Sequence, residues 1–71
     1  MRIEIAAPMS GKILEILVKL GDQVSYEDEL AILEALKMEN PIYAPADGKV
    51  VEIRVAAGAT VEAEQVLIVI E

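Results

Sequence analysis

Short apolar stretches alternate with charged residues along the whole chain. In residues 49–55, three apolar side chains interleave with Glu52 and Arg54, and this period of two is typical of a β-strand with one buried face. Residues 30–33 and 66–70 are continuous apolar, β-prone runs. The only helix-like stretches, residues 26–29 and 62–65, are single turns too short to stand alone as helices. The pattern therefore predicts an all-β chain.

The sequence repeats itself at an offset of 37 residues. A shift of that length aligns two stretches, about 7–34 and 44–71, without a gap, and all four glycines fall into two matched pairs. Matched Ala-Pro and glycine positions at a constant offset indicate an internal duplication. The matched positions include Ala7-Pro8 with Ala44-Pro45, Gly11 with Gly48, Gly21 with Gly58, and Glu27 with Glu64.

Two half-repeats of this length cannot each bury a core, so they must pack against each other. We expect one domain over residues 1–71, a flattened β-barrel or sandwich of about eight short strands. It would be built from two interlocked four-strand halves around a pseudo-twofold axis. Matching the first half to residues 49–55, where Val51 points inward, places Leu14, Ile16 and Val18 inward and Leu17 outward. The glycines of the matched pair at 21 and 58 are expected in turns that need permissive φ angles.

The composition restricts the possible functions. The chain has no histidine or cysteine, so the most common general base, the most common metal ligand and the thiol nucleophile are absent; we expect a protein that is not an enzyme. A net charge of −7 disfavours nucleic acid and anionic membranes as partners. The acidic run 27–29 is interpreted as a solvated face, with no metal site. No targeting signal or membrane span is recognisable, which favours a cytoplasmic location.

The residues that the repeat leaves unexplained, 35–43, form the predicted hairpin between the halves. A tight turn should fall at Leu36-Lys37, yet residues 35–39 include no Gly, Asn or Asp, the types that two-residue hairpin turns favour because φ must be positive. Such violations of local rules tend to mark functional sites. The twofold axis would place this turn at one end of the domain and both termini at the other. An ordinary solvated lysine remains the alternative for Lys37.

The hairpin sequence Glu34-Ala35-Leu36-Lys37-Met38-Glu39 resembles the attachment motif of biotinyl domains, in which Ala-Met-Lys-Met is usual. The resemblance extends over nearly the whole chain and implies a flattened β-barrel in which Lys37 carries covalent biotin, flanked by Leu36 and Met38 as partner-facing contacts. It implies a biotin carboxyl carrier domain of a carboxylase or decarboxylase. A biotin protein ligase would attach the cofactor, and carboxybiotin would move between a biotin carboxylase and a carboxyltransferase.

Two other functions stay open on the sequence. Lipoyl domains share a closely similar fold but usually have Asp-Lys-Ala at the turn, whereas this chain has Leu36-Lys37-Met38. An unmodified biotinyl-like interaction module, in which Lys37 is incidental, is the second alternative. Leu36 also departs from the methionine that is usual in biotinyl domains, but the two side chains are apolar and similar in volume, so we expect modification to survive the change.

Overall fold

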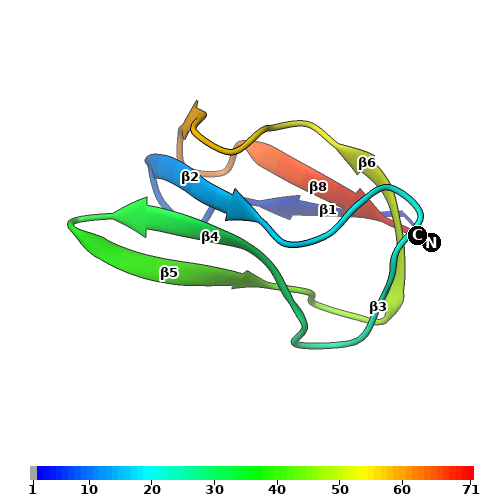
Figure 1. Ribbon diagram of the computed structural model, residues 1–71. Helices are drawn as coiled ribbons and strands as arrows, with labels where there is room; N and C mark the ends of the chain where they lie inside the picture. The colour runs from blue at the N-terminus through cyan, green and yellow to red at the C-terminus, as the bar shows by residue number, and fades with distance from the viewer. Residues whose placement is uncertain (1) are drawn as a thin grey trace.

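Eight short strands in two antiparallel sheets make up the computed structural model, which describes residues 2–71 (Figure 1). One sheet has the strand order β1-β8-β6-β3 and the other β5-β4-β2-β7. Residues 2–71 contain no helix, and the all-β prediction is confirmed. The strands are β1 (Ile3–Ala6), β2 (Gly11–Ile16), β3 (Gln23–Val24), β4 (Glu29–Ala35), β5 (Met38–Tyr43), β6 (Gly48–Ile53), β7 (Thr60–Val61) and β8 (Val66–Ile70).

Each sheet contains strands from both halves of the chain. Strands β2 and β4 of the first half are joined by β7 of the second half, while β6 and β8 are joined by β3 of the first half. The short strands β3 and β7 are thus exchanged between the halves. This exchange is the interlocking that the duplicated sequence predicts, and it makes the two sheets depend on each other.

The 37-residue offset recurs in the backbone. The amide of Gly21 donates to the carbonyl oxygen of Val50 at 2.8 Å, and the amide of Gly58 donates to that of Ile13 at 2.6 Å. Both bonds run from one half to the other. Gly21 and Gly58 also share a φ of 92°, in the left-handed region that side chains disfavour. The prediction that these two glycines need permissive φ angles is confirmed.

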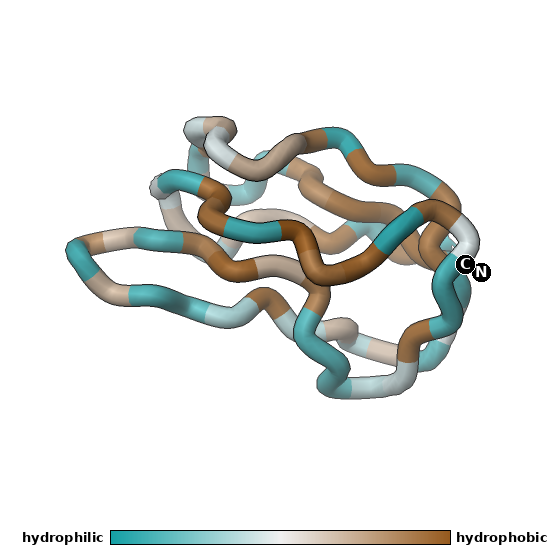
Figure 2. The backbone as a smooth tube through the Cα atoms, in the orientation of Figure 1, coloured by the Kyte–Doolittle hydropathy of each residue, from teal (hydrophilic) through white to brown (hydrophobic). Residues whose placement is uncertain are grey.

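The core lies between the two sheets and is entirely aliphatic. Figure 2 shows brown, apolar segments along the facing strands, and among residues 2–71 no polar or charged side chain is buried. Because no polar side chain is buried there, the side chains of the core stabilise the fold through apolar burial. The largest fully buried side chains are Ile13, Leu30, Leu33, Val50, Val61, Leu67, Ile68, Val69 and Ile70.

The prediction that Leu14 of β2 and Val51 of β6 point inward is wrong. Leu14 and Val51 are 36% and 38% exposed, whereas their neighbours Ile13 and Val50 are buried. The registers of β2 with β4 and of β6 with β8 shift at these equivalent points, as a β-bulge does when it adds one residue to a strand. In Figure 2, β2 accordingly shows teal segments between longer brown ones instead of strict alternation.

Two equivalent connections form β-turns, not the helical turns that the sequence suggested. The amide of Asp28 donates to the carbonyl of Ser25 at 2.9 Å, with Glu27 at a φ of 70°. The corresponding turn ends at Gln65, with Glu64 at a φ of 69°. A positive φ before the closing residue is incompatible with a helical turn.

The β4–β5 hairpin and the termini lie at opposite ends of the molecule. Figure 1 shows both chain ends together at the right and the hairpin turn at the left, along the longest dimension of 32 Å. The placement expected from the twofold axis is confirmed. Within residues 2–71 there is no helix long and apolar enough to cross a membrane.

Candidate functional site

The turn between β4 and β5 consists of two residues, Leu36 and Lys37. The strands pair as far as Ala35 opposite Met38, and the two turn residues have φ values of 54° and 64°. Positive φ at both central positions is the mark of a type I′ hairpin turn. The predicted position and conformation are confirmed. Each non-glycine residue in this region costs about 1–2 kcal/mol, so the turn holds strain.

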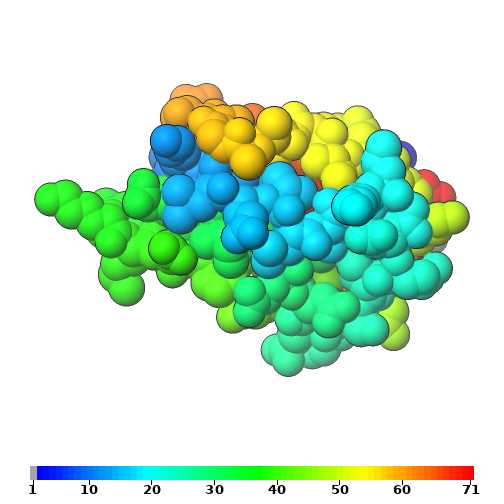
Figure 3. Space-filling model, viewed as in Figure 1, coloured from blue at the N-terminus to red at the C-terminus, as the bar shows by residue number. Residues whose placement is uncertain are grey.

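The side chains of this turn project from the molecule. Leu36 is 88% exposed and Met38 66% exposed, and Lys37 is exposed as well. Within the described part of the chain, no carboxylate oxygen lies within ion-pair distance of the Lys37 amine. Figure 3 shows this tip, in green, extending beyond the rest of the surface. The amine of Lys37 is therefore open to another protein.

The strands beneath the turn hold it in a fixed direction. Strand β4 pairs with β5 from Glu29 to Ala35 and with β2 on its other edge. Ala35, the last residue before the turn, is only 6% exposed. On the other strand, the side-chain amide of Asn40 donates to the carbonyl oxygen of Met38 at 3.1 Å. Because Ala35 on one side of the turn is buried and Met38 on the other side is hydrogen-bonded, the turn holds Lys37 on a rigid support.

A shallow groove beside the turn was not foreseen from the sequence. Gly11 is one of its lining residues, and β2 approaches β4 closely there, because a Cβ on Gly11 would collide with the carbonyl oxygen of Glu34 and lie 3.1 Å from Leu33 Cδ1. The matching of Gly11 with Gly48 in the sequence could have indicated such a close approach. Which strand approaches is determined by the register of β2 with β4, which the sequence alone does not give. The groove is lined by Ser10, Gly11, Lys12, Thr60, Val61 and Glu62 together with residues 34–37 of the hairpin.

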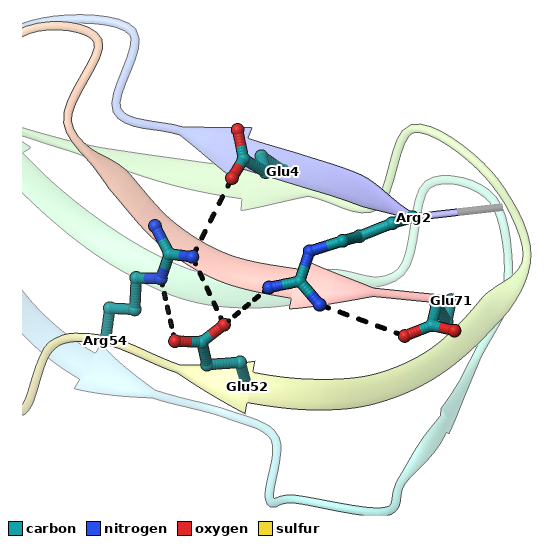
Figure 4. A network of polar contacts seen from close by, with 5 residues as sticks. All are labelled: Arg2, Glu4, Glu52, Arg54 and Glu71. Carbon is teal, nitrogen blue, oxygen red and sulfur yellow. Dashed lines mark hydrogen bonds and ion pairs between the residues drawn. The ribbon is translucent and has the colours of Figure 1, made fainter.

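A network of paired charged side chains lies on the other sheet, on the outer face of β1, β8 and β6 (Figure 4). Arg54 donates to Glu52 at 2.9 Å, and Arg2 donates to the same carboxylate at 2.9 Å. Arg54 also lies 3.7 Å from Glu4, and Arg2 lies 3.9 Å from Glu71. The hydrogen bonds from Arg54 lower the pKa of Glu52, and the nearby positive charges of both arginines add to the effect.

The acidic run 27–29 is exposed. Among residues 2–71, no three side chains of metal-ligating type come together.

Comparison with known proteins identifies the family. The sequence profile of the family described as biotin-requiring enzyme matches residues 2–70. The glutaconyl-CoA decarboxylase gamma subunit of Acidaminococcus fermentans is 55% identical over 40 residues, or 56% of this chain and 28% of that subunit. The biotin carboxyl carrier protein of Streptococcus mutans is 61% identical over 36 residues, or 51% of this chain and 28% of that protein. The chain thus spans about a quarter of the length of these relatives.

Solved structures agree with this assignment. The urea carboxylase of Kluyveromyces lactis superposes over the whole of this chain, which covers 6% of that protein, with a TM-score of 0.94 and 30% identity. A single-chain, multi-domain long-chain acyl-CoA carboxylase superposes over 96% of this chain and 7% of its own, with a TM-score of 0.90 and 26% identity. The chain therefore belongs to the biotin-requiring enzyme family, in which it is a biotinyl domain, a carrier of the cofactor and not itself a catalyst.

Proposed function

We propose that Lys37 is the residue to which biotin is joined, and that the domain carries this biotin between a biotin carboxylase and a carboxyltransferase of a biotin-dependent carboxylase or decarboxylase. The observation that carries the proposal is the two-residue turn that holds Lys37 at positive φ at the end of the domain. Strain at an exposed turn is a feature that functional sites retain. Glycine and asparagine would relieve it, but neither offers an amine.

The residues at the turn fit a covalently bound biotin. An amide bond between the Lys37 amine and the biotin carboxylate would remove one positive charge, and no ion pair within residues 2–71 depends on that charge. Leu36 and Met38 flank the amine with exposed apolar side chains, which suit contact with a modifying enzyme or a partner. When bound, biotin supplies the ring that accepts and donates a carboxyl group.

This chain's own contribution is presentation. The flexible lysine stem begins at a rigid turn, so the cofactor moves within a limited volume at one end of the domain. A tethered reactant acts as if it were present at a high local concentration. The termini lie at the opposite end, so the turn can enter a partner's active site without obstruction from them.

The attachment is tested by intact mass. The domain is produced with an active biotin protein ligase and biotin, as the wild type and as Lys37→Arg, which keeps the charge and three other lysines, Lys12, Lys19 and Lys49. We expect the wild type to gain the mass of one biotinyl group and the variant to gain nothing. Biotin on the variant, or none on the wild type, would reject Lys37 as the attachment site.

The same experiment with a lipoyl ligase addresses the lipoyl-carrier alternative. A wild-type domain that gained only a lipoyl group would identify a lipoyl carrier, and a domain modified by neither ligase would identify an unmodified interaction module. We also propose the ligase as a partner. The domain would meet the ligase and the carboxylase components in the cytoplasm, which we propose as its location.

A further inference from the structure

The two outer faces of the sandwich differ although their strands are related by the 37-residue offset. On the sheet β1-β8-β6, Val69 lies between Glu4 and Glu52. It is fully buried, although its neighbours in the register are charged residues of the outer face. The arginines of the network described above, Arg2 and Arg54, lie on the same face and pair with these carboxylates (Figure 4). The stems of such side chains cover apolar surface, so this face is closed.

The equivalent face of β5-β4-β2 lacks that cover. Ile32, which corresponds to Val69, lies between Glu15 and Pro41, and it is partly exposed. The position of Arg54 is taken by Leu17, which is 42% exposed, and two residues beyond Pro41 lies Tyr43, which is 51% exposed. We call this surface the open face and define it as Leu14, Leu17, Ile32, Pro41 and Tyr43. Leu14 does not distinguish the two faces, because its equivalent Val51 is similarly exposed; the difference lies in the other four residues.

The open face is large enough to bind but too small for a permanent complex. Five partly exposed apolar side chains present a few hundred Å², which is about the size of the largest patch of an ordinary monomer and is often functional. A stable interface needs roughly 800 Å² from each partner. A patch of this size suits a contact that forms and breaks repeatedly, as a carrier requires.

The charges around the open face select its partner. Glu15 lies beside Ile32, Glu29 lies opposite Tyr43, and the next row toward the hairpin carries Glu34 and Glu39 with a single cation, Lys12. A second copy of this chain would bring these carboxylates against each other, which is unfavourable. A surface with an apolar centre and lysine or arginine residues around it would be complementary.

We propose that the open face docks transiently on a basic, apolar-centred surface of the biotin carboxylase, and so fixes the orientation in which the turn enters its active site. The face is continuous with the hairpin, because β4 and β5 form both. The identity of the partner rests on the proposed function. The docking itself does not require biotin, and this allows the two to be tested separately.

The first experiment copies the closed face onto the open one. In Leu17→Arg/Pro41→Glu, the new arginine can pair with Glu15 and with the new glutamate, as Arg54 pairs with Glu52 and Glu4. Val51→Arg is the matched control, because it places an arginine at a similarly exposed valine of the other sheet. All three domains are biotinylated and compared as substrates of a biotin carboxylase that accepts the wild type. We expect the double variant to raise KM at least tenfold with little change in kcat, and the control to match the wild type.

The second experiment removes biotin altogether. The Lys37→Ala domain, labelled with ¹⁵N, is titrated with the same carboxylase, and amide signals of β2, β4 and β5 should shift or broaden while those of β1, β6 and β8 do not. Equal KM values for all three domains, or perturbations confined to residues 35–39 or located on the closed face, would overturn the proposal. Perturbations that depend on domain concentration without carboxylase would identify a second copy as the occupant instead. Failure of biotinylation alone would reject Lys37 but leave this titration decisive.

Discussion

Replacing the strained turn with favoured turn residues should stabilise the domain. In Leu36→Asn/Lys37→Gly, both residues tolerate the φ values of 54° and 64° that now cost about 1–2 kcal/mol each. Glycine gives back about 0.5–1 kcal/mol through the entropy of the unfolded chain. Little burial is lost, because Leu36 is 88% exposed. We expect a net gain of about 1–3 kcal/mol, with a rise in Tm of roughly 4–8 °C for each kcal/mol in a domain of this size.

The measurement is urea and thermal denaturation of biotin-free proteins, so that the loss of the lysine does not alter the comparison. Met38→Gly is the control, because Met38 is also exposed but lies in a strand at negative φ, where glycine should destabilise by about 0.5–1 kcal/mol. A double variant no more stable than the wild type would show that the turn stores no strain, and the physical reason given above for the unusual sequence would be wrong.

Three further outcomes are expected. Gly21→Ala and Gly58→Ala should each lower the free energy of unfolding by about 1 kcal/mol or more, because φ is 92° while no atom lies within 4 Å of the added methyl group; no change in either would contradict the strain. Gly11→Ala should cost more than either by the same denaturation assay, since its methyl group would meet the Glu34 carbonyl; an equal or smaller loss would show that β2 and β4 separate easily. Glu52 has a lowered pKa, so its contribution to stability is present above the unfolded pKa of about 4.3 and is lost as pH falls through the folded value. Glu52→Gln should therefore flatten the acid limb of a plot of Tm against pH, and an unchanged limb would exclude Glu52 as its source.

The sequence predicted the turn because the residue types that hairpin turns favour are missing there. It did not predict the positive φ of Glu27 and Glu64, where the two equivalent β-turns also lack glycine or asparagine. The offset of 37 residues identified the halves, and the absence of Gly, Asn or Asp at residues 35–39 identified the place where ordinary turn chemistry fails. The structure places Leu36 and Lys37 at positive φ there. Attachment of biotin depends on a reaction at the exposed Lys37 amine, and it stays a prediction.

The bulges and the difference between the two faces could not be predicted in the same way. One extra residue at Leu14 or Val51 turns the preceding side chains of the strand to the opposite face of the sheet. The nearby alternation of apolar and polar residues does not signal this insertion. Val69 is buried between Glu4 and Glu52, which pair with Arg2 and Arg54, and these residues come together only through the registers of three strands. Sequence periodicity describes one strand at a time, so it contains no information on such neighbours.

The common position of the two termini determines how the domain can be attached to other proteins. Arg2 and Glu71 are close enough for their side chains to lie 3.9 Å apart, and Figure 1 shows both ends on the side away from the β4–β5 turn. A fusion partner, surface anchor or affinity tag joined at either end would therefore lie on the side of the domain opposite the hairpin turn. Either junction should leave the lysine equally accessible, so the order of modules in a designed chain can be chosen freely.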